Sequence, residues 1–288
     1  MRPFLCRLVS HKFGGSSRLH IEFFQADDAA VSFQNRAMHY ADGLFETLRV
    51  SGGIIPLWGL HRERLLRGAR VLKFDFDQAA VATLKRRIDD ELNAFTGVLK
   101  ILVLRDWSGR GYATQTDTVQ VWISTHPLPN IVASISIGLS AVKLARQPIL
   151  AGVKHLARIE NTLASRQLRS GDFDDLLMLD TTGCVIETTK ANVFFKLNQH
   201  WITPPLEHSG VAGVMREYLL GQWAHYFPGP VSIKELRADD LPSVSHGFSC
   251  NAVTGLTPIN TLLGRELSED STLSSIQLAI AKMLSSND

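Results

Sequence analysis

Lys154 is the residue of this chain best suited to covalent chemistry. It lies in the segment LAGVKHLARIENTL at 150–163, with Leu150, Val153 and Leu156 close by in the sequence. An apolar neighbourhood disfavours the ammonium form and lowers the pKa of a lysine, and a neutral amine is what Schiff-base formation requires. The alternative is a surface lysine whose stem packs on apolar residues while its amine stays in water. The segment taken alone leaves both interpretations open.

Two other segments are suited to binding an anion. Gly213, Val214 and Met215 open a predicted helix, where unpaired backbone N–H groups and the helix dipole favour negative charge. Arg110 is flanked by glycines in SGRGY at 108–112, so a flexible loop would let it close on a carboxylate. An exposed hairpin tip is the alternative for that arginine. The sequence thus offers one amine and two candidate anion sites.

Several other chemistries have no motif in this sequence. The stretch GGSS at 14–17 lacks the lysine of a P-loop, and Gly109-Arg110-Gly111 lacks the third glycine of a dinucleotide loop. HExxH, paired-cysteine and GxSxG patterns are all missing. We therefore expect no metal site, and hydride transfer and serine hydrolysis are disfavoured.

Composition predicts a globular protein that works on small molecules. The chain has 288 residues, of which 45% are hydrophobic, enough for a sizeable core in one large or two medium domains. A net charge of +2 offers no electrostatic footprint for nucleic acid or an anionic membrane. The three cysteines are odd in number and form no CxxC, and the N-terminus does not read as a signal peptide, which together favour the reducing cytoplasm.

The positions of apolar residues predict the elements that must hold these groups. The N-terminal half is predicted to have strands at 40–50, 54–57, 98–105 and 119–124 and helices at 58–72 and 78–95, after 30 poorly periodic residues read as a short strand or a flexible arm. The C-terminal half is predicted to have strands at 133–141, 176–180, 185–195, 231–236 and 247–251 and helices at 156–168, 210–220 and 272–284. In the helix at 156–168, Leu156, Ile159, Leu163 and Ala164 are expected to face inward. Two mixed α/β halves would meet near a linker at 126–132.

The lysine segment resembles that of the fold-type IV (class IV) pyridoxal-phosphate enzymes, and is most similar to the aminodeoxychorismate lyases among them. Further family-like motifs occur in the family's order over about residues 32–260. They are YADGLFETLRV (40–50), HRERL (61–65), SGRGY (108–112), IETTKANVFF (186–195), TPPLEHSGVAGVMRE (203–217) and CNAVTGLTPI (250–259). The sequence departs from the family at Asn35, where Asp is common, and at Ala41, where Gly is usual.

The resemblance implies a fold and an assembly. The fold would be a two-domain α+β or α/β architecture like that of D-amino acid aminotransferase, with mixed sheets and flanking helices. Residues 1–125 would form the smaller N-terminal domain, 126–132 the linker, and 133–288 the larger domain that binds pyridoxal 5′-phosphate. Family members dimerise, so a homodimer is implied.

The resemblance also implies residue roles around the cofactor. Lys154 would hold pyridoxal 5′-phosphate as a Schiff base and move the proton, and Glu187 would face the pyridine nitrogen and keep it protonated. The phosphate would be bound by Arg64, Gly213, Val214, Met215 and Asn251. The alternatives are an exposed strand carboxylate for Glu187, a helix-surface arginine for Arg64 and a turn-forming asparagine for Asn251.

The implied reaction converts 4-amino-4-deoxychorismate to 4-aminobenzoate and pyruvate, a step of folate synthesis. Arg110 and Tyr112 would hold the substrate carboxylate. Tyr40, Phe45 and Glu46 would line the pocket, with a simple core residue as the alternative for Phe45. Two alternatives stay open: a class IV aminotransferase acting on D-amino or branched-chain amino acids, and a cofactor-free binding protein that kept the fold.

Overall fold

The structure is a computed structural model that describes residues 4–13, 16–25, 35–106, 109–114, 116–268 and 270–285. Backbone contacts divide the chain into two units. The first holds the described residues up to Leu128 together with Val153–Ala157, and the second holds Pro129–Gly152 and the described residues from Arg158 onward. The chain therefore enters the second unit, returns to the first for a short segment that contains Lys154, and then goes back.

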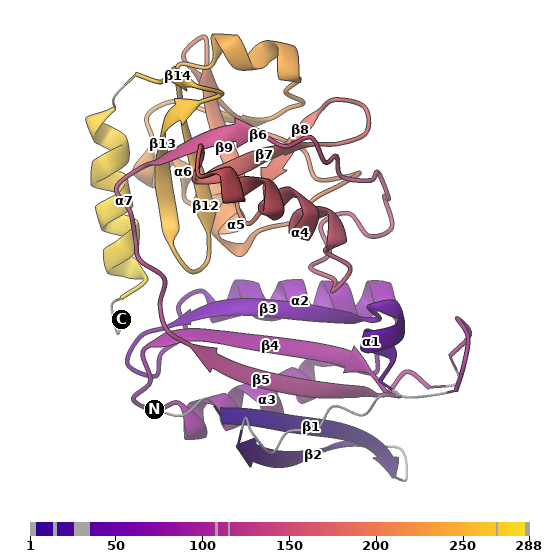
Figure 1. The fold of residues 1–288 in the computed structure, drawn as a ribbon. Helices are drawn as coiled ribbons and strands as arrows, with labels where there is room; N and C mark the ends of the chain where they lie inside the picture. The colour runs from indigo at the N-terminus through magenta and orange to yellow at the C-terminus, as the bar shows by residue number, and fades with distance from the viewer. Residues whose placement is uncertain are drawn as a thin grey trace. The chain divides into compact units, whose positions relative to one another are not determined.

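An antiparallel sheet of five strands forms the frame of the first unit (Figure 1). Its strand order is β2-β1-β5-β4-β3, so β3 lies at an edge of this sheet. The strands are β1 (Phe4–Phe13), β2 (Ser16–Gln25), β3 (Gly43–Val50), β4 (Gly97–Arg105) and β5 (Val119–His126). An edge strand has a row of backbone groups that its own sheet does not pair, and this edge receives the lysine segment described below.

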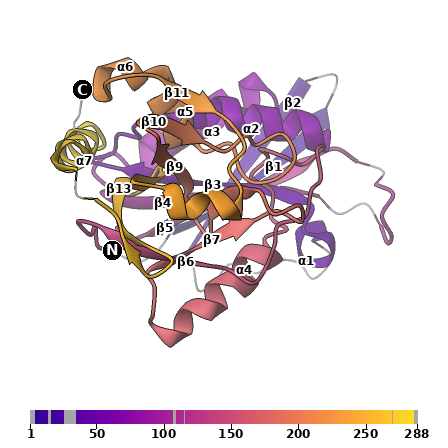
Figure 2. The same ribbon diagram turned by 90° about the horizontal axis from the view of Figure 1, so that it is seen from above.

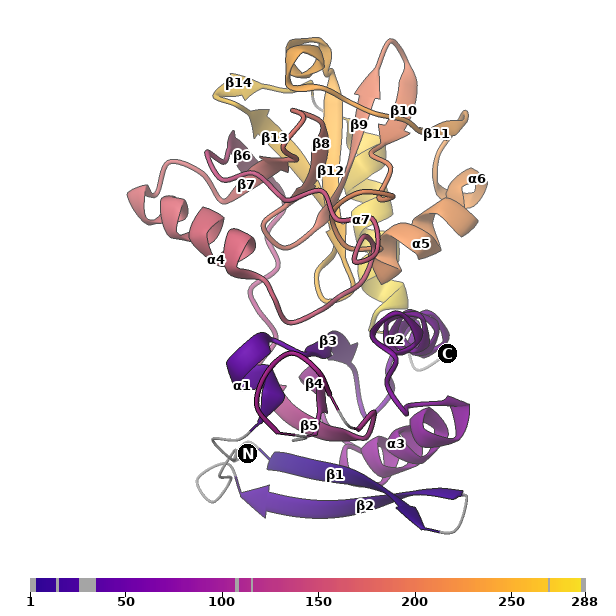
Figure 3. The same cartoon turned by 90° about the vertical axis from the view of Figure 1, so that its right-hand side faces the viewer.

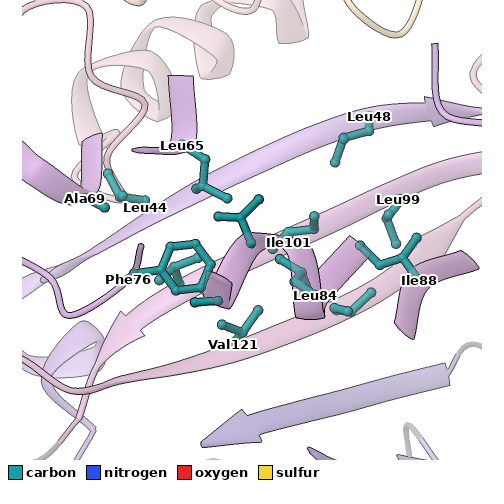
Figure 4. Close-up of a cluster of buried hydrophobic side chains, with 14 of the residues drawn as sticks. Leu44, Leu48, Leu65, Ala69, Phe76, Leu84, Ile88, Leu99, Ile101 and Val121 are labelled. Carbon is teal, nitrogen blue, oxygen red and sulfur yellow. The ribbon is translucent and has the colours of Figure 1, made fainter. Parts of the chain in front are cut away.

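Three helices accompany this sheet: α1 (Arg36–Tyr40), α2 (Trp58–Leu72) and α3 (Gln78–Glu91). In Figure 3, α2 and α3 lie on the same side of the sheet. Alternate residues of the strands point to that side, where Leu99 and Ile101 of β4 pack with Leu84 and Ile88 of α3 (Figure 4). Each of these four side chains is at most 1% exposed, and burial of such a side chain contributes about 1.5–3 kcal/mol.

Most elements predicted in this half are confirmed, and the helix predicted at 58–72 has those bounds. The first 30 residues differ, because β1 and β2 pair along ten residues each. The two strands pair with each other, and β1 also pairs with β5; apolar spacing does not report such backbone pairing. The strand predicted at 54–57 is wrong, since only an isolated bridge joins Ser51 and Ile54 across the turn.

A mixed sheet of nine strands forms the frame of the second unit. Its order is β11-β10-β9-β12-β13-β6-β7-β8, with β14 paired to β13. The strands are β6 (Ile135–Leu139), β7 (Asp175–Leu179), β8 (Val185–Thr188), β9 (Asn192–Leu197), β10 (His200–Thr203), β11 (Val231–Ile233), β12 (His246–Asn251), β13 (Gly255–Leu262) and β14 (Arg265–Glu266). Parallel pairs (β6 with β7 and with β13, and β10 with β11) need long connections between the strands.

The helices of the second unit are α4 (Ile159–Arg166), α5 (Val214–Gly221), α6 (Trp223–Tyr226) and α7 (Ser271–Met283). Stacked aromatic rings join α6 to the sheet, with the ring centroid of Trp223 in α6 5.4 Å from that of Phe194 in β9. Phe227, which follows α6, lies 5.4 Å from Phe248 of β12. Figure 2 shows α7 along the same unit, where it packs on β13. In the described part of the chain, no helix combines the length and the apolar character needed to cross a bilayer.

Two expectations for this half are wrong in detail. The run predicted as one strand at 185–195 is two strands, because Thr188 closes a turn in which its hydroxyl accepts the N–H of Ala191 at 3.0 Å. The helix predicted at 156–168 begins at Ile159 and has only Ala164 fully buried, while Ile159 is 64% and Leu163 is 41% exposed. In the described structure α4 packs chiefly on β7, through a narrow face, so the apolar spacing overstates its burial.

Candidate functional site

The lysine segment is paired with the free edge of β3. Phe45 donates its backbone N–H to the carbonyl of Lys154 at 3.0 Å, and Leu156 donates to the carbonyl of Gly43 at 3.0 Å. A side chain at Gly43 is excluded, because a Cβ atom there would lie 2.5 Å from Leu156 Cδ1. These backbone bonds fix the register of the segment and place Lys154 opposite Phe45.

The ring of Phe45 lies beside two lysine amines. Its centroid is 4.2 Å from Lys154 Nζ and 5.8 Å from Lys100 Nζ. An aromatic face attracts an ammonium group and gives its alkyl stem an apolar surface to pack on. Phe45 is half-buried and outside the core cluster of this unit. Its position therefore supports a role beside the Lys154 amine, and its contact with a substrate stays a prediction.

Glu46, the next residue of β3, was expected to line the pocket with Phe45, and this is wrong: it faces the opposite side of the sheet and is buried under α2. Arg64 of that helix donates from Nε to Glu46 Oε1 at 2.8 Å, and from Nη2 to Oε2. His61 Nδ1 lies 2.8 Å from the same Oε2. Glu46 and His61 are each 1% exposed, and Arg64 is 6% exposed. A paired and hydrogen-bonded arrangement is the condition under which charges persist in a protein interior.

The protonation states of this cluster follow from its contacts. Burial by itself would raise the pKa of Glu46, but the charge and hydrogen bonds of Arg64 and the hydrogen bond of His61 outweigh it and lower that pKa to about 2. Burial lowers the pKa of His61, against the opposing pull of Glu46 and with the help of the charges of Arg64 and Lys154. Glu46 is thus an acceptor and His61 is neutral at pH 7, so Nδ1 carries the imidazole proton.

Acidification is expected to destabilise this unit through both groups. The unfolded chain takes up a proton on His61 below pH 6.5 and on Glu46 below pH 4.5, while the folded state resists both. The Glu46 contribution, about 3 kcal/mol, is complete above pH 4.5 and is lost as pH falls toward 2. Urea unfolding between pH 7 and pH 3 measures this loss. A free energy of unfolding that is flat or rises on acidification would contradict the ionised Glu46–Arg64 pair.

Arg64, predicted to bind the phosphate, is therefore also the partner of a buried carboxylate. The alternative of an ordinary helix-surface arginine is wrong at 6% exposure. Sequence reasoning missed the pairing with Glu46 and His61, although a signal existed. Glu46 alternates with Leu44 and Leu48 on the buried face of β3. A carboxylate on that face needs a positively charged partner from the helix that covers it.

The substrate residues predicted on the SGRGY motif lie beside α1. Tyr40, the last residue of that helix, accepts the backbone N–H of Gly111 at 3.1 Å on its hydroxyl, and its ring centroid is 5.4 Å from that of Tyr112. Arg110 is exposed and Tyr112 is 88% exposed. The structure brings Tyr40 and Tyr112 together, while Arg110 extends from an exposed turn as its alternative interpretation anticipated. Substrate binding by all three stays a prediction.

Glu187 lies on β8 in the second unit and is 5% exposed. Its Oε2 accepts the backbone N–H of Val211 at 2.9 Å and lies 3.5 Å from Nδ2 of Asn192. Asn192 also donates to the carbonyl of Val211 at 3.0 Å, so it joins β9 to the 210–212 segment. The alternative of an exposed strand carboxylate is wrong. A buried carboxylate held from one side can accept a strong hydrogen bond from a protonated ring nitrogen.

The start of α5 has the form expected of an anion site. Gly213 is its N-cap and makes no side-chain capping bond, and the following Val214 and Met215 are buried at 1% and 0%. Their backbone N–H groups belong to the first turn, which has no intrahelical acceptors. Packing explains the glycine, because a Cβ atom at Gly213 would lie 1.9 Å from Asn192 Oδ1.

Gly213→Ala is expected to lower the free energy of unfolding by about 1–3 kcal/mol. The new methyl group has to displace Asn192, which then loosens Glu187 and weakens pyridoxal phosphate binding. Thermal unfolding and a cofactor titration measure the two effects. Gly221→Ala in the same helix is the matched control, since a Cβ atom there meets nothing within 4 Å, and it is expected to be neutral or stabilising. Equal behaviour of the two variants would contradict the Gly213–Asn192 contact.

The side chain of Asn251 stabilises the turn in which it lies. Its Oδ1 accepts the N–H groups of Val253 and Thr254, both at 2.9 Å, in the connection between β12 and β13. This is the turn-forming role stated as the alternative to phosphate binding. Only its amide N–H₂ remains as a side-chain donor, and the phosphate role stays a prediction.

The residues present fit pyridoxal 5′-phosphate in the chemistry of their donors. Within the first unit are an amine on a fixed backbone and a buried guanidinium. Within the second unit are a buried carboxylate and an uncapped helix start. Burial raises the pKa of Cys250 to about 12, so this thiol stays protonated and offers no competing nucleophile. Among the described residues, no group of three or more His, Cys, Asp or Glu is arranged to hold a metal ion.

Comparison with known proteins shows what this chain is similar to. The chain is 31% identical over 249 residues to aminodeoxychorismate lyase of Vibrio harveyi, covering 82% of this chain and 89% of that protein. It is similar to the crystal structure of 4-amino-4-deoxychorismate lyase from Pseudomonas aeruginosa, with a TM-score of 0.83, 31% identity and coverage of 90% and 97% of the two chains. Branched-chain amino acid aminotransferase of Escherichia coli shares the fold at 20% identity, with a TM-score of 0.81 and coverage of 93% and 94%.

These structures confirm the predicted fold-type IV architecture of mixed sheets with flanking helices. A family model described as "Amino-transferase class IV" matches residues 43–262. The match covers well over half of the chain and includes Lys154, Glu187 and the start of α5. The chain belongs to the class IV aminotransferase family, whose enzymes depend on pyridoxal 5′-phosphate.

Proposed function

We propose that this protein is a pyridoxal-phosphate-dependent carbon–oxygen lyase that converts 4-amino-4-deoxychorismate to 4-aminobenzoate and pyruvate. The observation that carries the proposal is the 31% identity to aminodeoxychorismate lyase over 82% of the chain. The backbone pairing that fixes Lys154 on the edge of β3 and the burial of Glu187 support it. The product would feed folate synthesis.

Bound here, pyridoxal 5′-phosphate supplies an aldehyde that condenses with an amine and a ring that takes up an electron pair. Lys154 is the amine that holds the group between reactions. Its Nζ then takes the proton from the substrate carbon that bears the amine. The six-membered ring would become aromatic as the bond between the adjacent ring carbon and the enolpyruvyl oxygen breaks. The released enolpyruvate would take up one proton at its methylene carbon and so become pyruvate.

Glu187 is assigned to the pyridine nitrogen of the cofactor. Its carboxylate would accept a hydrogen bond from that nitrogen and favour its protonated form, which would make the ring a better electron acceptor. Val211 and Asn192 hold Oε2 of this carboxylate, so its orientation is set before any ligand binds. Arg64 and the N–H groups of Val214 and Met215 are assigned to the phosphate, where a guanidinium fork and a helix start both favour an anion.

Substrate binding is assigned to the loop beside α1. Arg110 offers a guanidinium to the substrate carboxylate, and Tyr40 and Tyr112 offer adjacent rings and hydroxyl groups. Phe45 lies at the Lys154 amine and limits the approach of water to it. A bidentate pair between arginine and carboxylate gives orientation as well as affinity.

A class IV aminotransferase acting on D-amino or branched-chain amino acids is the second candidate. The E. coli branched-chain aminotransferase has the same fold, and Lys154, Glu187 and Arg64 would serve either reaction. Incubation with 4-amino-4-deoxychorismate discriminates between them. The lyase forms 4-aminobenzoate and pyruvate in equal amounts. Conversion of the bound cofactor to its amine form by an amino acid, without any 4-aminobenzoate, would establish the aminotransferase instead.

The proposal extends to the setting of the enzyme. The two units are assigned as a smaller N-terminal domain and a larger cofactor-binding domain joined near residues 126–132. The protein works in the cytoplasm as a homodimer, and binds neither nucleic acid nor membranes. Sedimentation equilibrium of the loaded protein tests the dimer, for which a mass of about twice the 31.9 kDa of one chain is expected.

A further inference from the structure

Arg36 is a buried arginine, and its contacts lead to the substrate loop. It is the first residue of α1 and is 2% exposed. Its Nη1 donates to the carbonyl of Gly111 at 3.0 Å, and its Nη2 donates to the carbonyl of Tyr112 at 3.1 Å. Its Nε donates to Asp42 Oδ2 at 3.1 Å. One guanidinium thus ties two consecutive loop carbonyls to a carboxylate next to β3.

Tyr40 holds the same loop from the other end of α1. Its hydroxyl accepts the N–H of Gly111 at 3.1 Å, and the guanidinium carbon of Arg36 lies 4.8 Å from the centroid of its ring. Both backbone polar groups of Gly111 are therefore bound by side chains of one helix. This anchoring fixes the peptide that directly follows Arg110.

Arg110 itself has no such support. Its side chain makes no hydrogen bond or ion pair with any of the residues that the structure describes. It lies between Gly109 and Gly111, whose φ values of +101° and +88° belong to the left-handed region that favours glycine. The position of the Arg110 guanidinium therefore depends on how firmly the neighbouring peptide groups are held. Precise placement is what makes binding of a carboxylate productive.

We propose that Arg36 is a positioning residue for substrate binding, which holds the 109–112 loop so that Arg110 is presented to the carboxylate of the substrate. The inference rests on the proposed function in that Arg110 is taken to bind this carboxylate. Arg36 does not touch the substrate. Its hydrogen bonds hold the loop backbone in place, which an exposed arginine between two glycines cannot do by itself.

The start of α1 is built to place Arg36. Asn35 is the N-cap and accepts the N–H of Ala37 on Oδ1 at 2.8 Å, so the Asn that departs from the family's Asp caps the helix equally well. The other departure, Ala41, has a φ of 53°, which explains why glycine is usual there. Both positions thus serve the helix that holds the loop.

Arg105 provides a matched control within the same network. It donates from Nε to Asp42 Oδ2 at 2.9 Å and from Nη1 to Asp117 Oδ1 at 2.7 Å. It is buried like Arg36, at 5% exposed against 2%. Its described bonds reach Asp42, Asp117 and the carbonyls of residues 72, 73 and 116, and none goes to Gly111 or Tyr112. Lysine cannot reproduce either set of contacts, because one ammonium replaces a planar fork.

The first test compares steady-state kinetics of Arg36→Lys and Arg105→Lys with 4-amino-4-deoxychorismate. The Arg36 variant is expected to raise KM about 10-fold with kcat within about 3-fold, the loss expected for a misplaced charge-assisted hydrogen bond. The Arg105 variant is expected to keep KM within about 2-fold of the parent. An unchanged KM for Arg36→Lys, or an equal rise in both variants, would overturn the positioning role.

The second test needs no catalysis. Trypsin cleaves after arginine, so the rate of cleavage at Arg110–Gly111 reports how firmly this peptide is held in the cofactor-loaded protein without substrate. Arg36→Lys is expected to be cut several-fold faster there, while Arg105→Lys keeps the parent rate. If the parent forms no 4-aminobenzoate, the proposed function fails, but the proteolysis still decides whether Arg36 anchors the loop.

Tyr40→Phe covers the case in which Arg36→Lys does not fold. It removes only the hydroxyl that binds Gly111 N–H and keeps the ring. We expect faster cleavage after Arg110 and a KM about 3-fold higher, as the loss of one hydrogen bond predicts. Cleavage and KM both equal to those of the parent would contradict anchoring of the loop by α1.

Discussion

Lys154→Ala is expected to lower the rate of 4-aminobenzoate formation by at least roughly 10⁴-fold. The amine that holds the cofactor and moves the proton is then missing. Among the described residues, no other lysine lies in a segment whose backbone is hydrogen-bonded to the free edge of β3. The segment is held by backbone hydrogen bonds, so the fold is expected to survive the substitution. Single-turnover measurement of product with saturating cofactor gives the rate.

Lys143→Ala is the control for this change. Lys143 is exposed and belongs to the same connection between β6 and α4, and its loss is expected to leave the rate within about 2-fold. Turnover by Lys154→Ala at the parent rate would remove the basis of the mechanism. A folded variant, shown by an unchanged circular dichroism spectrum, is required for either conclusion.

Glu187→Gln is expected to reduce kcat roughly 10²–10³-fold, because a neutral amide does not stabilise a proton on the pyridine nitrogen. Gln keeps one oxygen to accept the N–H of Val211, so the local structure is retained. The electron-accepting power of the ring falls while binding of the phosphate is unchanged. Both kcat and the dissociation constant of pyridoxal 5′-phosphate are measured. We expect a large fall in kcat and little change in the dissociation constant.

Glu207→Gln removes an exposed carboxylate from the loop before α5 and is the control. It is expected to match the parent in both measurements. If Glu187→Gln retained kcat within about 2-fold, or lost cofactor binding as strongly as kcat, Glu187 would not be the group at the ring nitrogen.

The elements of this fold were predictable where local spacing decides them. Helix α2 has its predicted bounds, and β4 is the apolar run expected for a buried strand. The hairpin of β1 and β2 was not predicted, because it depends on the pairing of the two strands with each other and of β1 with β5, which is far away in the sequence. The burial of α4 was overestimated for a related reason, since periodicity shows which residues share a face and not what covers that face.

The candidate site also has one part that the sequence predicts and one part that it does not. A single lysine in an apolar segment and a helix that opens at Gly213 were visible in the sequence and led to the family. The contacts that set the chemistry were not, because they join residues distant in the chain: Phe45 to Lys154, Arg64 to Glu46, and Arg36 to Gly111. Asn192 went unnoticed for this reason too, and it supports both Glu187 and the start of α5.

The most direct measurement is the site of covalent attachment of the cofactor. Borohydride reduction of the loaded protein, followed by proteolysis and mass spectrometry, is predicted to place the pyridoxyl group on Lys154 and nowhere else. Lys100 is the informative competitor, because its amine faces the same ring of Phe45 at 5.8 Å. A label on Lys100, or no label on either lysine, would contradict the account.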